Sequence, residues 1–140
     1  MSVYIRVELQ RQVRSHFANR CAYCQTVERL TMAIFEIEHI IPRSVGGATT
    51  FENLCLACPT CNRYKARRQA AADPLTDEIV PLYHPHQQSW SEHFVWSEDG
   101  AEIVGRTPMG RATIAALRMN RPQLIHVRRM WVKMGEHPPD

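Results

Sequence analysis

Two Cys-x-x-Cys pairs constrain the fold of this chain more than any other feature. Cys21 and Cys24 form the first pair, and Cys58 and Cys61 form the second. A Cys-x-x-Cys pair is the shortest link that lets one turn present two sulfurs to a single ion. Four thiolates suit Zn²⁺, which is borderline-soft and accepts a closed tetrahedral shell without redox chemistry. The two pairs therefore predict a structural zinc site.

A fifth cysteine leaves the choice of the second pair open on spacing alone, because Cys55 and Cys58 also form a Cys-x-x-Cys pair. We assign Cys58 and Cys61 to the metal, since Cys55 lies in the alternating run Leu54-Cys55-Leu56, where a thiol serves as a small hydrophobic side chain. The alternative interpretation is that one pair is redox-active or merely buried. An odd number of cysteines fits poorly with a complete disulfide framework.

The length of 140 residues suits a single domain over 1–140 with a modest core, which a metal site would help to stabilise. An apolar content of 44% excludes a chain that is disordered throughout. No apolar run approaches the roughly 18 residues of a membrane-spanning helix, and no leader with an apolar centre is visible. We therefore expect a soluble, cytoplasmic protein without membrane contact, in a compartment where thiols stay reduced.

Hydrophobic periodicity and chain-breaking residues predict an α+β fold. The predicted elements are a helix over about 5–17, a strand from Leu30 to near His39, a strand over 51–57, a helix over 62–72, a hairpin over 93–105 with Asp99-Gly100 as its turn, a helix from 107 to near 120 and a helix from 122 to about 134. A proline-rich connector over 73–85 separates a core of about 18–72 from a C-terminal extension of about 80–135.

Polar residues suited to hydrolytic chemistry lie between the cysteine pairs and just after them. An imidazole such as that of His39, with an ordinary pKa near 6.5, can accept a proton at neutral pH. Glu38 and Asn62 offer hard oxygen atoms of the kind that Mg²⁺ and Mn²⁺ prefer. Each of these residues alone, like Asn53, is more often a packing, turn or surface residue. Their occurrence together, between the two cysteine pairs and just after them, favours a functional interpretation.

In this order the motifs resemble the His-Asn-His (HNH) endonuclease family, whose ββα-metal motif often carries a four-cysteine zinc site. The matching features over 21–65 are Cys-x-x-Cys, Glu-His-Ile-x-Pro, a Gly-Gly loop, Asn-Leu and Cys-x-x-Cys-Asn-x-x-Lys. The resemblance implies a zinc-stapled α+β domain with a ββα-metal core, an N-terminal helix and a C-terminal extension of a hairpin and helices.

The resemblance also implies an activity, namely a metal-dependent endonuclease that hydrolyses DNA. His39 would be the general base, and Asn53 would orient its imidazole through a hydrogen bond. Glu38 and Asn62 would hold one Mg²⁺ or Mn²⁺ ion, and cleavage would leave 5′-phosphate and 3′-hydroxyl ends. Two alternatives remain open: a non-catalytic zinc module that binds DNA or RNA, and a protein-interaction domain.

The net charge of +3 is mild, but the basic residues are unevenly distributed. One group follows the second cysteine pair (Arg63, Lys65, Arg67 and Arg68), and another dominates the C-terminal third (Arg106, Arg111, Arg118, Arg121, Arg128, Arg129 and Lys133). Solvated helix faces would explain either group alone. A nuclease site beside the first group favours phosphate contact, and we expect Arg43, Arg63 and Lys65 to bind nucleic acid.

Overall fold

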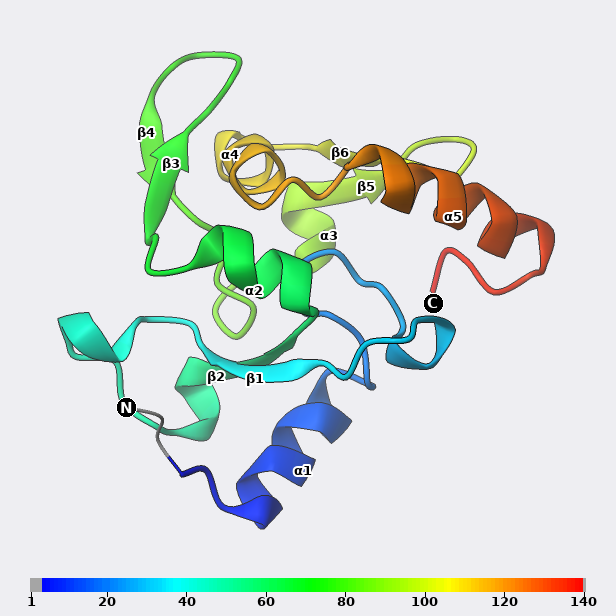
Figure 1. Cartoon of the computed structure of the whole chain (residues 1–140). Coiled ribbons are helices and arrows are strands. Elements are labelled where there is room, and N and C mark those ends of the chain that lie inside the picture. Colours follow the sequence, from blue (N-terminus) through cyan, green and yellow to red (C-terminus); the bar gives the residue numbers. More distant parts are fainter. Residues whose placement is uncertain (1–3, 140) are drawn as a thin grey trace. The chain divides into compact units, whose positions relative to one another are not determined.

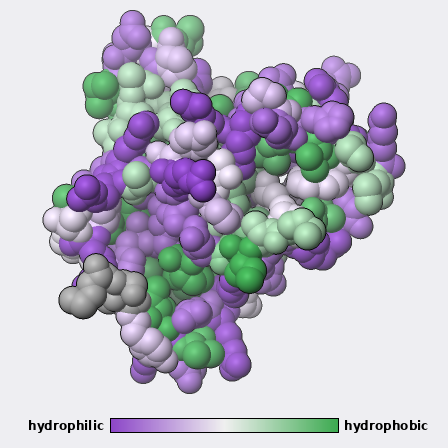
Figure 2. Space-filling model, viewed as in Figure 1, coloured by the Kyte–Doolittle hydropathy of each residue, from purple (hydrophilic) through white to green (hydrophobic). Residues whose placement is uncertain are grey.

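The structure, a computed structural model, describes residues 4–139 and divides the chain into two compact units, Met1–Arg63 and Tyr64–Asp140. Each unit combines helices with short antiparallel strand pairs, which confirms the predicted α+β class (Figure 1). That the two units form one domain stays a prediction. On the face drawn in Figure 2, hydrophilic residues predominate and hydrophobic ones form smaller groups between them. No helix among the described residues has the length and apolar character needed to span a membrane.

The first unit is built on an antiparallel pair of strands. Its elements are α1 (Val7–His16), η1 (Glu28–Leu30), β1 (Glu36–His39), η2 (Arg43–Val45), η3 (Phe51–Asn53), β2 (Leu54–Ala57) and α2 (Pro59–Lys65), the last of which ends in the second unit. Every residue of β2 is buried, and α1 packs on this strand with Val13 fully buried. The register pairs His39 with Leu54, so His39, the predicted general base, lies at the end of the strand pair.

The predicted strand from Leu30 is too long at its N-terminal end, since β1 begins only at Glu36. The backbone just before it is bonded to side chains instead of to a strand. The amide of Phe35 donates to the carboxylate of Glu28 at 2.7 Å, and its carbonyl accepts from the guanidinium of Arg14 at 2.9 Å. These contacts hold the chain outside the ladder, although its residues have good strand propensity.

The predicted helix over 62–72 is wrong in both position and length. The helix α2 spans Pro59–Lys65, and Ala66 follows it in the left-handed region with a φ of 47°. Ala70–Ala72 form strand β3, which pairs with β4 (Ile79–Pro81). Alanine favours helix, but this preference is weak beside the hydrogen bonds of a paired strand.

The second unit contains the predicted hairpin and both predicted helices. Its further elements are α3 (Trp90–His93), β5 (Phe94–Trp96), β6 (Ile103–Gly105), α4 (Pro108–Leu117) and α5 (Pro122–Lys133). Gly100 in the turn has a φ of 74°, which glycine adopts without strain. Thr107 caps α4 by accepting a hydrogen bond from the amide of Gly110. The helix α4 packs against β3, β4 and β6.

Two arginines of the C-terminal basic group stabilise the fold of the second unit. Arg111 donates from Nε and Nη2 to both carboxylate oxygens of Asp73, at 2.9 and 2.8 Å, and holds the pKa of that carboxyl well below its usual range. Arg128 is fully buried and donates to the carbonyls of Ala101 and Met119 at 3.0 and 2.7 Å. Both side chains therefore have partners within the second unit.

Candidate metal centre and active site

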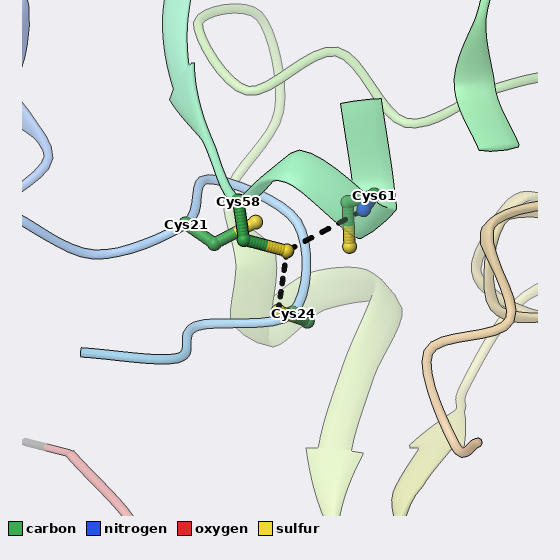
Figure 3. Close-up of side chains that lie close together, drawn as sticks. All are labelled: Cys21, Cys24, Cys58 and Cys61. Atoms are coloured by element: carbon green, nitrogen blue, oxygen red, sulfur yellow. Dashed lines mark hydrogen bonds between the residues drawn. The ribbon is translucent and has the colours of Figure 1, made fainter. Parts of the chain in front are cut away.

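The four cysteines assigned to zinc lie together and point toward one another (Figure 3). Their sulfur atoms all lie within 4.8 Å of one another, and all four residues, Cys21, Cys24, Cys58 and Cys61, are buried. The first pair comes from the turn after α1, and the second comes from the junction of β2 and α2. The structure therefore confirms that the four cysteines assigned to zinc from the sequence lie together.

The cluster has the dimensions of a tetrahedral zinc site. The Sγ atoms of Cys24 and Cys58 are 3.9 Å apart. Zinc–sulfur bonds of about 2.3 Å give a tetrahedron with edges of about 3.8 Å, whereas a disulfide would bring two sulfurs to about 2.05 Å. The amide of Cys61 also donates to Sγ of Cys58 at 3.4 Å, as in a metal-binding turn. The donor set and its geometry suit a structural zinc ion.

The strand pair brings the two cysteine turns together. The amide of Ala22, within the first turn, donates to the carbonyl of Leu56 in β2 at 2.7 Å. Two residues after Leu56 the chain reaches Cys58. Burial raises the pKa of the Cys21 thiol, and a bound cation would favour its thiolate form.

The fifth cysteine lies outside the metal cluster, and its environment is more polar than predicted. Cys55 pairs with Glu38 across β1 and β2, and its thiol donates to Oε2 of Glu38 at 3.5 Å and lies 3.7 Å from the hydroxyl of Tyr23. All three residues are buried. Cys55 is therefore a member of a buried polar group and not simply a small hydrophobic side chain.

Replacing Cys55 by alanine is expected to leave the zinc content unchanged. The substitution removes a buried thiol and its hydrogen bonds, which costs about 1–2 kcal/mol of stability, but it removes no metal ligand. Zinc analysis of the purified variant by mass spectrometry checks this result. Loss of the metal from Cys55→Ala, with retained folding, would mean that the cluster is assigned to the wrong cysteines.

The imidazole of His39 is held by a residue that the sequence analysis did not identify. Its Nε2 lies 2.8 Å from Oγ1 of Thr49, in the loop between β1 and β2. Partial burial, and to a smaller degree the charge of Arg43, hold the pKa of His39 below its usual value. The ring is therefore neutral at neutral pH, which is the form that can accept a proton.

The predicted hydrogen bond from Asn53 to His39 is wrong. Asn53 instead accepts from the amide of Ile41 at 2.8 Å and donates to the carbonyls of Ile41 and Ala48, at 3.1 and 2.8 Å. Its side chain is buried and satisfies backbone groups that the loop would otherwise leave without partners. Asn53 thus shapes the loop that carries Thr49, and it influences His39 only through that loop.

The two glycines of the loop are required by its geometry. Gly46 has a φ of 95°, in the left-handed region. A side chain on Gly47 would meet the carbonyl oxygen of Ile41 at 1.8 Å, so only glycine fits there. Together with Asn53, these residues fold the loop back onto the end of β1 and present Thr49 to His39.

Glu36 and Glu38 supply oxygen donors from within β1, whereas His39 is the last residue of the strand, where its alternation ends. Adjacent strand residues point to opposite faces, so Glu36 and Glu38 share one face and lie about 7 Å apart along the strand. The amide nitrogen of Asn62, on α2, donates to Oε1 of Glu36 at 3.0 Å. This bond leaves the carbonyl oxygen of Asn62 available as an acceptor or a metal ligand.

The structure therefore joins the predicted residues to other groups and not to one another. Among the described residues, His39, Asn53 and Asn62 form no hydrogen bond with each other or with Glu38. The sequence analysis missed two contacts, Thr49 to His39 and Glu36 to Asn62. The sequence could have indicated Glu36 as a further site residue, because a residue two positions before Glu38 in a strand lies on the same face. The contact of Thr49 depends on the loop fold and had no local signal.

The basic residues predicted to bind nucleic acid differ in exposure. Arg43 and Arg63 are exposed. Lys65 is 1% exposed, so the prediction that it contacts phosphate is wrong for this structure. Its position on the buried side of α2 could not be read from a run of basic residues.

Comparison with known proteins gives one match. Residues 21–68 match the family model described as HNH endonuclease. This segment contains all four clustered cysteines together with Glu38, His39, Asn53 and Asn62. Neither the curated proteins nor the solved structures give a match to the chain.

Proposed function

We propose that this chain, whose residues 21–68 match the HNH endonuclease family model, is a metal-dependent endonuclease that hydrolyses phosphodiester bonds in DNA. The observation that carries the proposal is the contact of 2.8 Å between the imidazole of His39 and Thr49, at the end of β1 inside the matched segment. A structural zinc ion on the four cysteines would hold β2 and α2 to the turn after α1.

His39 would act as the general base. If Nε2 donates its proton to Oγ1 of Thr49, the lone pair of Nδ1 is left to accept a proton from water. The oxygen of that water forms a bond to phosphorus as the bond to the 3′ oxygen breaks. The products are a 5′-phosphate and, after the leaving oxygen takes up a proton, a 3′-hydroxyl. The role of Thr49 is to fix the tautomer and orientation of the ring.

Glu38 and Asn62 would hold a divalent cation, Mg²⁺ or Mn²⁺, and their oxygen atoms have the hardness that these ions require. When bound, such an ion supplies positive charge to the scissile phosphate and the leaving oxygen. Glu36 orients the amide of Asn62 through their hydrogen bond, so its carbonyl oxygen remains the free donor. The exposed side chains of Arg43 and Arg63 would contact flanking phosphates.

A second candidate function is a zinc module that binds DNA or RNA without cleaving it. The burial of Glu38 favours this alternative, because its carboxylate contacts the thiol of Cys55 and would have to exchange that contact for a cation. Such a module requires the zinc cluster and the basic residues, and it requires no base at position 39.

Cleavage of supercoiled plasmid distinguishes the two functions. The zinc-loaded protein is incubated with plasmid and either Mg²⁺ or Mn²⁺, and nicked and linear products are separated on a gel. The endonuclease predicts products that form only when the cation is added. Binding that weakens with salt, without products under any cation, would establish the non-catalytic module instead. Absence of binding at low salt would leave only a protein-interaction domain.

A further inference from the structure

The C-terminal basic group contributes to a cavity in the second unit, and we propose that this cavity binds the phosphate backbone of DNA. The cavity has a volume of about 490 Å³. Its lining includes residues of the turn that joins α4 to α5, and Figure 1 shows this turn. Its lining includes Tyr64, Arg118, Arg121 and Gln123, and we call it the α4–α5 cleft. The inference deepens the proposed function, on which it rests, by locating a contact for the substrate.

The guanidinium of Arg118 lies in the cleft with its N–H groups available to a ligand. Its guanidinium lies over the ring of Tyr64, 4.8 Å from the ring centroid. Among the described residues its side chain donates no hydrogen bond and forms no ion pair. Stacking orders the planar group while its N–H donors remain at the edge, which is the geometry that binds a phosphate with two parallel hydrogen bonds.

Arg121 places a second guanidinium at the same cleft. Its Nη1 donates to the backbone carbonyl of Arg118 at 3.1 Å, and this bond fixes its side chain across the turn. The turn itself is set by Arg118, which has a φ of 51° and ends α4. Two cationic side chains therefore line the same cleft from one short turn, where both can contact phosphate oxygens.

The described residues that line the cleft include no acidic side chain. The sequence from Ile103 to Gly135 also contains no aspartate or glutamate. The helix α5 begins at Pro122 without a side-chain cap, and its twelve residues add the positive end of a helix dipole. These features supplement the two arginines and would not define a site by themselves.

The fold separates the arginines of this region by role. Arg111 is bound to Asp73, and Arg128 is buried against backbone carbonyls. Arg118 and Arg121 line the cleft together with an aromatic ring and an amide side chain. A cavity of this size accommodates a phosphate with its sugar, and Tyr64 offers a surface for the sugar or base.

The experiment measures binding of a fluorescent DNA duplex by anisotropy, over a series of salt concentrations, without added divalent cation. The variants are Arg118→Gln, Arg121→Gln and the double substitution, and the control is Arg129→Gln. Arg129 is on α5, its side chain is 58% exposed, its Nε lies 3.8 Å from Oδ2 of Asp99, and it does not line the cavity, so the control removes the same charge as each single cleft variant from a site outside the cleft. Arg118→Lys tests the bidentate geometry at constant charge.

The double variant is expected to bind about ten-fold more weakly at moderate salt, with a salt slope smaller by about two. Arg118→Lys should retain the slope and lose part of the affinity. If Arg118→Gln and Arg121→Gln each bound DNA as tightly as Arg129→Gln, with unchanged thermal unfolding, the proposal would be overturned. If the cleft proposal failed in this way and the wild-type protein still cleaved plasmid, the endonuclease proposal would stand. Cleft-dependent binding without any cleavage would support the cleft and reject the endonuclease.

Discussion

Replacing His39 by alanine is expected to reduce the rate of metal-dependent DNA cleavage by about 10²- to 10⁴-fold, the usual contribution of a general base. The substitution removes the Nδ1 atom that would accept the proton of the attacking water. It leaves the zinc cluster, the loop and the basic residues in place, so affinity for DNA should change little. Single-turnover cleavage of plasmid at saturating protein measures the chemical step without a contribution from binding.

A second histidine supplies the matched control for this experiment. His126 is exposed on α5, outside the family segment, and His126→Ala should cleave at the wild-type rate. Wild-type cleavage by His39→Ala, at equal purity and zinc content, would exclude His39 as the base. The proposed mechanism would then be lost even though the chain would remain a nuclease.

Replacing Cys61 by alanine is expected to abolish tight zinc binding and to unfold the first unit. Cys61 is fully buried among the other three sulfurs, and its removal opens the tetrahedral shell. Zinc contributes about 10–16 kcal/mol to the folding of small zinc domains, which is comparable to the whole net stability of a typical protein, about 5–15 kcal/mol. Metal analysis after dialysis and circular dichroism during heating measure the two effects.

Cys55→Ala is the matched control for the zinc experiment, since Cys55 is equally buried and lies outside the cluster. Only the Cys61 variant should lose zinc and its cooperative transition at high temperature. If Cys61→Ala kept one zinc ion per chain and the wild-type melting temperature, the cluster would not be the structural site. Addition of a strong chelator to the wild-type protein should reproduce the effect of Cys61→Ala.

Spacing and local chemistry were sufficient to predict several parts of the protein. The choice of Cys58 and Cys61 over Cys55 followed from alternation in a strand, and the sulfur cluster confirms it. The start of α4 at Pro108, after Thr107, followed from capping rules that act within one turn. These features depend on neighbours a few residues away, so the chain encodes them locally.

The sequence by itself determined which four cysteines cluster, the α+β class and the resemblance of its central segment to HNH endonucleases, because each depends on residue types at fixed short spacings. Only the tertiary structure decided which groups touch. It placed Thr49 beside His39, moved Asn53 to the loop backbone, paired Asn62 with Glu36 and buried Lys65. It also gave Arg118 a different role from that of Arg111, although both belong to one basic group. Hydrogen bonds between residues distant in sequence depend on how the loops and helices pack. Short sequence patterns therefore do not predict them.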